Sequence, residues 1–332
     1  MQIVFTLCSI NYLAQAKTLG DSVLRHNPGY RFIIGLIDRN QTGVDLSFLG
    51  NNLELLEVER IGIDGLQDMC ERYTIVELVT ATKPFYFDYI FRHYPDAETA
   101  TYLDPDIKVF APLTELAEKL KSFNLILTPQ LTQPIQDGFL PTEKHVFNTG
   151  VFNLGFAAMR RGDEADKINA WWMSRLRYQC LADLPHGYFV DQLWMNLAPA
   201  YFEGVLIEKH PGWNAAHWNL HERTFTEADG HYLVNQKPLT FYHFSHYSPK
   251  RPDVIASHHT RFSFASRPDL RSLYKQYNDE LVANRYFDLV GVPCFYMNGE
   301  RQKKLKKQTM GWLRQNVPLS LKIRLGKLLK RS

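Results

Sequence analysis

The sequence predicts an α/β fold with a mostly parallel sheet, and three observations carry this prediction. The first hundred residues alternate short apolar runs rich in β-forming residues with runs of helical periodicity, as in a βαβ unit. Of the 332 residues, 45% are hydrophobic and 22% are charged, a composition that excludes a mainly disordered chain. No stretch reaches the ~18 uninterrupted apolar residues of a membrane-spanning helix, so we expect a globular protein of one or two domains.

The first βαβ unit is predicted from the N-terminus. Residues 2–8 (QIVFTLC) form an apolar run, and the opening segment lacks the basic stretch and cleavage site of a signal peptide, so we expect a strand. Residues 11–27 place apolar side chains at helical spacing, and a Pro-Gly pair ends that helix. Buried strands are expected at 31–38 and 51–59.

Helices and strands continue to alternate in the middle of the chain. Residues 66–93 are predicted to be helical, with Pro84 near the start of the last helix. Residues 100–110 (ATYLDPDIKVF) then give a strand, an acidic turn and a second strand. The segment 113–122 is a short amphipathic helix, and 125–129 (LILTP) is another strand.

The second half mixes helices with aromatic-rich strands. The segment 145–156 (HVFNTGVFNLGF) is rich in β-forming residues and is predicted as strand. Helices are expected at about 163–181, 190–202 and 268–288. Residues 204–250 are expected to form irregular strands and loops.

The charge of the chain is uneven. Residues 301–332 hold eleven Lys and Arg and no acidic residue, whereas the first 300 residues hold 27 basic and 35 acidic ones. A basic tail on an acidic body indicates an anionic surface as partner, and its interleaved apolar residues favour a membrane leaflet. The tail lies apart from the aromatic cluster at 211–247, which argues against nucleic acid. A solvated terminus without a partner is the alternative.

Several classes of site are excluded by the motifs that the sequence lacks. The four cysteines form no C-x-x-C pair, so we expect reduced thiols in a cytosolic protein rather than a zinc knuckle. The sequence has no P-loop, no G-x-G-x-x-G and no G-x-S-x-G element, which argues against a P-loop kinase, a dinucleotide-binding dehydrogenase and an α/β-hydrolase.

Asp104 and Asp106 are the first candidate site. They follow a predicted strand, at the edge where open α/β sheets bind ligands. Two carboxylates on one tight turn suit Mg²⁺ or Mn²⁺, the ions that a sugar diphosphate needs. Because the chain has 19 Asp, about one D-x-D is expected by chance, and a plain Asp-Pro turn is the alternative.

Three further groups could join that site. His243 could add an imidazole ligand, with His246 as competitor, although a lone His on a half-buried strand is more often simply hydrogen-bonded. The segment 147–150 (FNTG) offers an amide beside a flexible glycine. Asp191 and Gln192 offer an acid and an amide at a helix start, where an N-cap is the structural alternative.

Taken together, these motifs resemble the GT-A glycosyltransferases, in particular the retaining group that contains lipopolysaccharide galactosyltransferases, galactinol synthases and glycogenin. The likeness spans residues 1–250. It implies a GT-A nucleotide-diphospho-sugar transferase fold, with a Rossmann-like, mixed and mostly parallel sheet flanked by helices, and a helical, basic C-terminal extension. It also implies a catalytic domain at 1–255, with a nucleotide-sugar half at 1–110 and an acceptor-side half at 111–255. A helical extension at 256–300 and the basic tail at 301–332 follow.

The resemblance also implies roles for individual residues. Those that match the family's donor-binding positions are Thr6, Asn11 and Tyr12 for the base and ribose, Lys83 near the diphosphate, Asn148 for the donor sugar and Lys250 for a phosphate. Those that match its metal ligands are Asp104, Asp106 and His243, and those beside the anomeric centre are Asp191 and Gln192. The sequence departs from the family where Ser245 and His246 stand in place of a glycine-containing element, and a Ser-Pro-Lys-Arg-Pro run replaces Lys-Pro-Trp.

The activity implied is metal-dependent transfer of a hexose, from UDP in this family, to a hydroxyl of a glycan or lipid-linked oligosaccharide. Retention is expected, with Gln192 near the β face of the sugar; inversion would need Asp191 as base. The expected location is the cytoplasm, peripherally on the inner face of the cytoplasmic membrane. The alternatives are a sugar nucleotidyltransferase, which usually opens with a Gly-rich loop that TLCSINYL lacks, and a non-catalytic carbohydrate- or nucleotide-binding protein.

Overall fold

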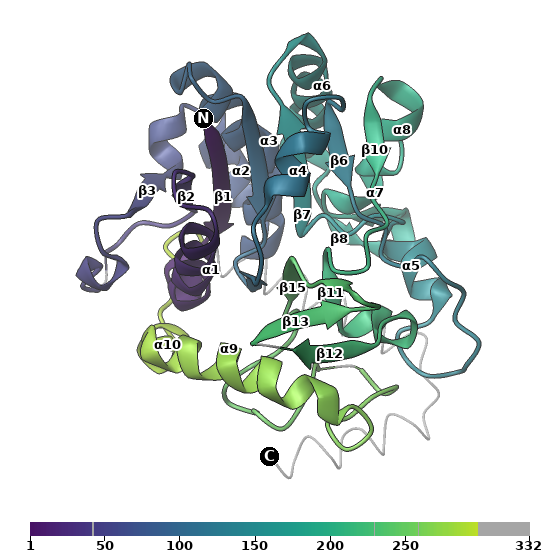
Figure 1. Ribbon diagram of the computed structural model, residues 1–332. Helices are drawn as coiled ribbons and strands as arrows, with labels where there is room; N and C mark the ends of the chain where they lie inside the picture. Colours follow the sequence, from purple (N-terminus) through teal and green to yellow (C-terminus); the bar gives the residue numbers. More distant parts are fainter. Residues whose placement is uncertain (42, 229, 258, 298–332) are drawn as a thin grey trace, which may run out of the picture.

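A computed structural model describes residues 1–41, 43–228, 230–257 and 259–297, which fold around a seven-stranded central sheet (Figure 1). The strands lie in the order β10 (Val205–Ile207), β6 (Leu125–Leu127), β7 (Phe156–Arg160), β4 (Thr99–Leu103), β1 (Gln2–Cys8), β2 (Arg31–Leu36) and β3 (Leu53–Glu57). Only β7 runs antiparallel to its neighbours β4 and β6. The prediction of a mixed, mostly parallel sheet is therefore confirmed.

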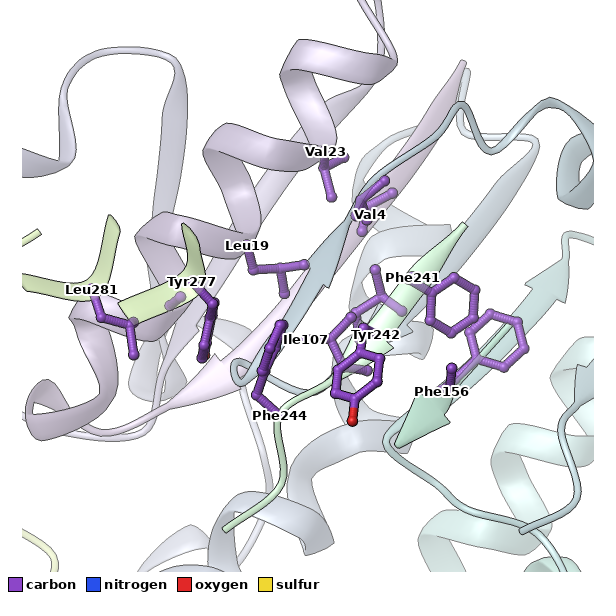
Figure 2. Packing of buried hydrophobic residues seen from close by; sticks show 14 of the residues in the cluster. Val4, Leu19, Val23, Ile107, Phe156, Phe241, Tyr242, Phe244, Tyr277 and Leu281 are labelled. Carbon is purple, nitrogen blue, oxygen red and sulfur yellow. The ribbon is translucent and has the colours of Figure 1, made fainter. Parts of the chain in front are cut away.

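Helices cover both faces of this sheet because successive residues of each strand point to opposite sides. Ile3, Phe5 and Leu7 share one core with residues of α2, α3 and α6. Val4 and Cys8 point into the other core, which α1 and α9 close from outside, as Figure 2 shows for Val4, Leu19 and Tyr277. The bounds of these helices are α1 (Leu13–His26), α2 (Leu66–Arg72), α3 (Ile75–His93), α6 (Asp163–Gln179) and α9 (Arg271–Ala283).

A small second sheet lies below the central one and joins distant parts of the chain (Figure 1). It consists of β11 (Ala215–Ala216), β15 (Phe241–His243) and β5 (Ile107–Val109), with β15 in the middle. β15 pairs antiparallel with β5, so that His243 lies opposite Ile107. Since Ile107 directly follows the acidic turn, this register carries His243 to the carboxyl edge of β4.

The remaining elements are short. They are η1 (Ile10–Tyr12), α4 (Thr114–Lys119), α5 (Glu143–Thr149), β8 (Ala182–Asp183), β9 (Tyr188–Phe189), α7 (Gln192–Met195), α8 (Ala198–Tyr201), η5 (His217–Glu222), β12 (Phe225–Ala228), β13 (His231–Val234), β14 (Lys237–Pro238) and α10 (Tyr286–Leu289), with further single 3-10 turns. Within the described ranges, no helix is long and apolar enough to span a membrane. The predicted basic tail, 301–332, lies outside the described residues.

Two local predictions are wrong. Pro84 is the tenth residue of α3 and does not lie near its start, because the helix begins at Ile75. A capping box precedes it, in which Thr74 and Glu77 satisfy each other's backbone N–H groups. The first half of the predicted strand 145–156 is helix α5. Its first turn is fixed by the Thr142 N–H, which donates to His145 Nδ1 at 3.1 Å, and Gly150, with a φ of +115°, ends it.

Candidate functional site

The two carboxylates of the D-x-D motif lie on a tight turn between β4 and β5. The Ile107 N–H donates to the Asp104 carbonyl at 3.0 Å and closes this turn. The Asp104 N–H donates to the Gly155 carbonyl at 2.8 Å, which ties the turn to the loop before β7. Tyr102 donates its hydroxyl proton to Asp104 Oδ1 at 2.5 Å, and burial followed by the charge of Asp104 raises the pKa of this phenol well above its ordinary value.

His243 completes a three-residue cluster with these carboxylates. Its Nε2 lies 3.0 Å from Asp106 Oδ1 and 3.7 Å from Asp104 Oδ2, and its ring forms a T-shaped pair with that of Trp218, with centroids 5.2 Å apart. Burial alone would lower the pKa of His243, but the charges of Asp106 and Asp104 raise it above its ordinary value. His246, the competing candidate, is exposed and is not in the cluster.

The cluster suits a divalent metal ion. One ligand atom from each of Asp104, Asp106 and His243 lies within 4.8 Å of the others. Two carboxylate oxygens and one imidazole nitrogen form a donor set that Mn²⁺ accepts, and Mg²⁺ favours the carboxylates. The absence of a side chain at Gly155 leaves space for the imidazole, because a Cβ at this position would lie 2.5 Å from His243 Cε1.

Lys83 lies next to Asp104 and is almost fully buried. Its Nζ forms an ion pair with Asp191 Oδ2 at 2.8 Å, lies 3.8 Å from Asp104 Oδ1 and donates to the Leu154 carbonyl at 2.8 Å. Burial lowers the pKa of Lys83, but Asp191 and then Asp104 raise it more, so the net pKa is above its ordinary value. Lys83 therefore remains a cation at neutral pH.

Gln192 and Asn153 form a polar pair next to this cation. Gln192 Oε1 accepts hydrogen bonds from the Leu154 N–H at 3.1 Å and from Asn153 Nδ2 at 3.5 Å. Asn153 Oδ1 accepts from Asn214 Nδ2 at 3.1 Å. Asn148, which the resemblance assigns to the donor sugar, is exposed on the last turn of α5, whereas Asn153 is not singled out from the sequence.

A pocket of about 220 Å³ leads to the carboxylates from one side. Its walls come from the end of β1, from η1, from the start of α3 and from the acidic turn. The lining residues are Leu7, Cys8, Ser9, Asn11, Tyr12, Ile75, Val76, Val79, Thr80, Tyr102, Asp104, Pro105 and Asp106. The pocket thus joins an apolar slot, in which Tyr12 lies across from α3, to an acidic end.

The structure places the other predicted residues as follows. Asn11 and Tyr12 line the pocket. Thr6 lies inside β1, is fully buried and does not line it, because its side chain faces the core rather than the carboxyl end of the strand. Lys250 is exposed on the turn that follows β15, and its N–H donates to Ser248 Oγ at 3.3 Å.

No protein-family model matches the chain. Two proteins of Bacillus subtilis (strain 168), both named as uncharacterized, are similar in sequence. YfnF is 25% identical over 283 residues, which cover 83% of this chain and 90% of that protein. YfnD is 27% identical over 174 residues, which cover 52% of this chain and 54% of that protein.

The order of the strands and the acidic turn at the end of β4 define an α/β fold of the GT-A type. A solved structure of the galactosyltransferase LgtC, in complex with donor and acceptor sugar analogs, shares this fold. The superposition covers 88% of this chain and 98% of the LgtC chain, with a TM-score of 0.51 and 18% sequence identity. The GT-A fold that the motifs predicted is thereby confirmed.

Proposed function

We propose that this protein is a metal-dependent glycosyltransferase that moves a sugar from a nucleoside diphosphate to a hydroxyl group. The observation that carries the proposal is the pocket that ends at Asp104 and Asp106, which form a cluster with His243. The buried ammonium of Lys83 lies 3.8 Å from Asp104 Oδ1. The GT-A fold supports the same activity. A nucleoside diphosphate has a flat base and an anionic end, and the pocket has an apolar slot and a cation-binding end to match them.

The base and ribose of the donor would bind between Tyr12 and the first turns of α3. Tyr12 is 44% exposed and Val76 is 62% exposed, so both present apolar surface to a ligand. Burial and the charge of Asp106 raise the pKa of Tyr12 to about 12, so its hydroxyl stays protonated and can donate. Asn11 adds an amide. Thr6 does not line the pocket, so we propose no contact between it and the donor. UDP is the nucleotide that the resemblance implies.

Asp104, Asp106 and His243 would hold Mn²⁺ or Mg²⁺. When bound, such an ion neutralises diphosphate oxygens and makes the nucleotide a better leaving group. Lys83 adds fixed positive charge on the same side, where negative charge develops as the sugar leaves. Lys250 is exposed and, among the described residues, has no ion pair, so we propose it as a second phosphate contact.

We propose that the configuration of the sugar is retained. Inversion is expected to use Asp191 as the base, and Asp191 is buried and paired with Lys83 at 2.8 Å. Retention requires no such base, because the departing phosphate oxygen can take the proton. Gln192 and Asn153 would then contact the donor sugar, a role that we give to Asn153 in place of the exposed Asn148.

The test is a donor screen with purified full-length protein. UDP- and GDP-sugars are incubated with Mn²⁺ or with EDTA, and released nucleoside diphosphate is measured. We expect slow hydrolysis of one donor that is lost with EDTA and in Asp106→Ala, while the folded structure of the variant is kept. Full activity in Asp106→Ala would contradict the assignment of Asp104, Asp106 and His243 as the metal site. Calorimetric binding of donors without turnover would point to a missing acceptor, and no binding at all would favour a non-catalytic protein.

For the acceptor and the location, we propose a glycan or lipid-linked saccharide reached from an anionic membrane surface. The support is the sequence of residues 301–332, which combines eleven basic residues with apolar ones. Co-sedimentation with liposomes that contain anionic lipid, with and without this tail, tests the proposal. Equal binding by both forms would remove it.

A further inference from the structure

A second hollow, of about 340 Å³, lies on the acceptor-side half of the chain. One wall is the loop at 131–134, and the other is α5 with the residues that follow it. The lining residues are Leu131, Thr132, Gln133, Pro134, Glu143, Val146, Phe147 and Val151. None of these residues takes part in the donor site described above.

The loop wall of this hollow is held in place by a buried carboxylate. Glu222 accepts hydrogen bonds from the backbone N–H groups of Thr132 at 2.9 Å and Gln133 at 2.6 Å, and its charge is paired with Arg223 at 2.5 Å. Asn219 Nδ2 donates to the Gln130 carbonyl at 3.3 Å. Residues 218–223 (WNLHER) therefore hold in place a loop without regular secondary structure, which preorganises a binding surface.

The helix wall is joined to the reaction centre through Gly150. A Cβ at Gly150 would lie 3.1 Å from Gln192 Cγ, so the end of α5 packs directly on this side chain. Gln192 Nε2 donates to the Thr149 carbonyl at 2.8 Å, and Gln130 Nε2 donates to the Gly150 carbonyl at 2.5 Å. One backbone segment, 147–151, therefore lines the hollow and contacts Gln192.

The chemistry of the lining is that of a site for a neutral sugar. Phe147 is 82% exposed, and Val151 is 48% exposed, so the hollow presents an apolar surface that nothing in the described structure covers. Glu143 lies four residues before Phe147 on the same face of α5. The lining contains this one carboxylate and no Lys, Arg or His. An aromatic ring packs against the CH face of a hexopyranose, and a carboxylate accepts from its hydroxyls. The lining offers no cation to pair with an anionic acceptor group.

We infer that this hollow is the acceptor subsite and that it binds a neutral hexopyranosyl unit, stacked on Phe147 with hydroxyls directed to Glu143. The inference rests on the proposed transferase function, because an acceptor subsite has meaning only beside a donor site. It assigns the acceptor to uncharged saccharides rather than to sugar phosphates or uronic acids.

The test is saturation-transfer NMR on the full-length protein. The probes are the methyl glycosides of glucose, galactose, mannose and N-acetylglucosamine, compared with glucuronic acid and galactose 1-phosphate. The variants are Phe147→Ala, the conservative Phe147→Trp and, as control, Tyr201→Ala, which removes another exposed aromatic ring from the last turn of a short helix. Binding of UDP with Mn²⁺ is measured on each variant by calorimetry.

We expect a neutral glycoside to bind, to be lost in Phe147→Ala and to be kept in Phe147→Trp and Tyr201→Ala, while UDP binding stays unchanged in all of them. Absence of neutral-glycoside binding, equal binding by Phe147→Ala, or stronger binding of the anionic probes would overturn the subsite. UDP binding separates this failure from failure of the proposed function: intact UDP binding leaves the donor site standing, and its loss in the wild-type protein removes both.

Discussion

Lys83 and Asp191 form an ion pair of 2.8 Å in which each side chain is only 2% exposed. Lys83 comes from the middle of α3, and Asp191 directly precedes α7, so the pair joins the N-terminal half of the chain to the half that carries Gln192. Such a pair contributes little net stability over apolar replacements, but an unpartnered charge in the same place is costly.

We therefore expect Lys83→Met and Asp191→Leu each to lower the free energy of unfolding by about 3–5 kcal/mol. The double variant should lose much less than the sum of the two, because it leaves no charge unpartnered. Urea unfolding of the four proteins gives the coupling energy. Additive losses would show that the two charges do not depend on each other. Donor hydrolysis should be lost in all three variants.

Binding of Mn²⁺ at the proposed metal site should distinguish the two candidate histidines. His243→Ala should weaken Mn²⁺ binding, measured by calorimetry in the presence of UDP, by at least about 10–100-fold, the loss that follows even from removing indirect partners of metal ligands. His246→Asn should change it little, because His246 is outside the cluster, and Asn tolerates the φ of +60° found there. The reverse pattern would make His246 the ligand.

Gly155 tests how closely the metal site is packed. A methyl group at this position would lie 2.5 Å from His243 Cε1 and 2.8 Å from Asn153 Oδ1, and neither is the end of a long flexible side chain. Gly155→Ala should therefore displace the imidazole, lower stability by about 1–3 kcal/mol and weaken Mn²⁺ binding together with UDP. The matched control is Gly138→Ala, where a Cβ meets no atom within 4 Å. Equal Mn²⁺ binding by both variants would contradict this account.

The parts of the site that follow from strand ends could be predicted from the sequence. Asp104 and Asp106 come directly after an apolar run, and the carboxyl ends of parallel strands form one edge of the sheet. The pairing that brings His243 to this edge depends on a contact between residues more than 130 positions apart. Sequence spacing alone could not choose His243 over His246, since register between distant strands is set by packing.

The amide that we propose for the donor sugar lies in one of two copies of the same sequence pattern, so the sequence alone could not choose between them. FNTG occupies 147–150 and FNLG occupies 152–155. The first copy forms the end of α5, and the second lies in the loop against Gln192. The signal that separates them is local: Thr142 and the glycine at 150 are start and stop signals of a short helix, which the β-rich composition of the segment conceals.

The histidines next to the metal cluster make stability depend on pH. His217 is 8% exposed, its Nδ1 has no partner among the described residues, and its ring lies 5.3 Å from that of His259. Burial, followed by the charges of His259 and His246, lowers the pKa of His217 well below 6.5, and burial lowers that of His259 to about 4. Both are therefore neutral in the folded protein at pH values where the unfolded chain already binds protons.

Since the unfolded state protonates these two histidines below pH 6.5, their contribution to stability falls as the pH drops through this value, and each costs about 1.4 kcal/mol at pH 5.5. The raised pKa of His243 acts in the opposite direction. We expect His217→Gln to lose about 1.4 kcal/mol less unfolding free energy between pH 7.5 and pH 5.5 than the wild-type protein, in urea unfolding at each pH. The control is His231→Gln, an exposed histidine, which should keep the wild-type dependence. If His217→Gln also keeps it, His217 takes up its proton in the folded state, and the acid sensitivity of the protein has its origin elsewhere.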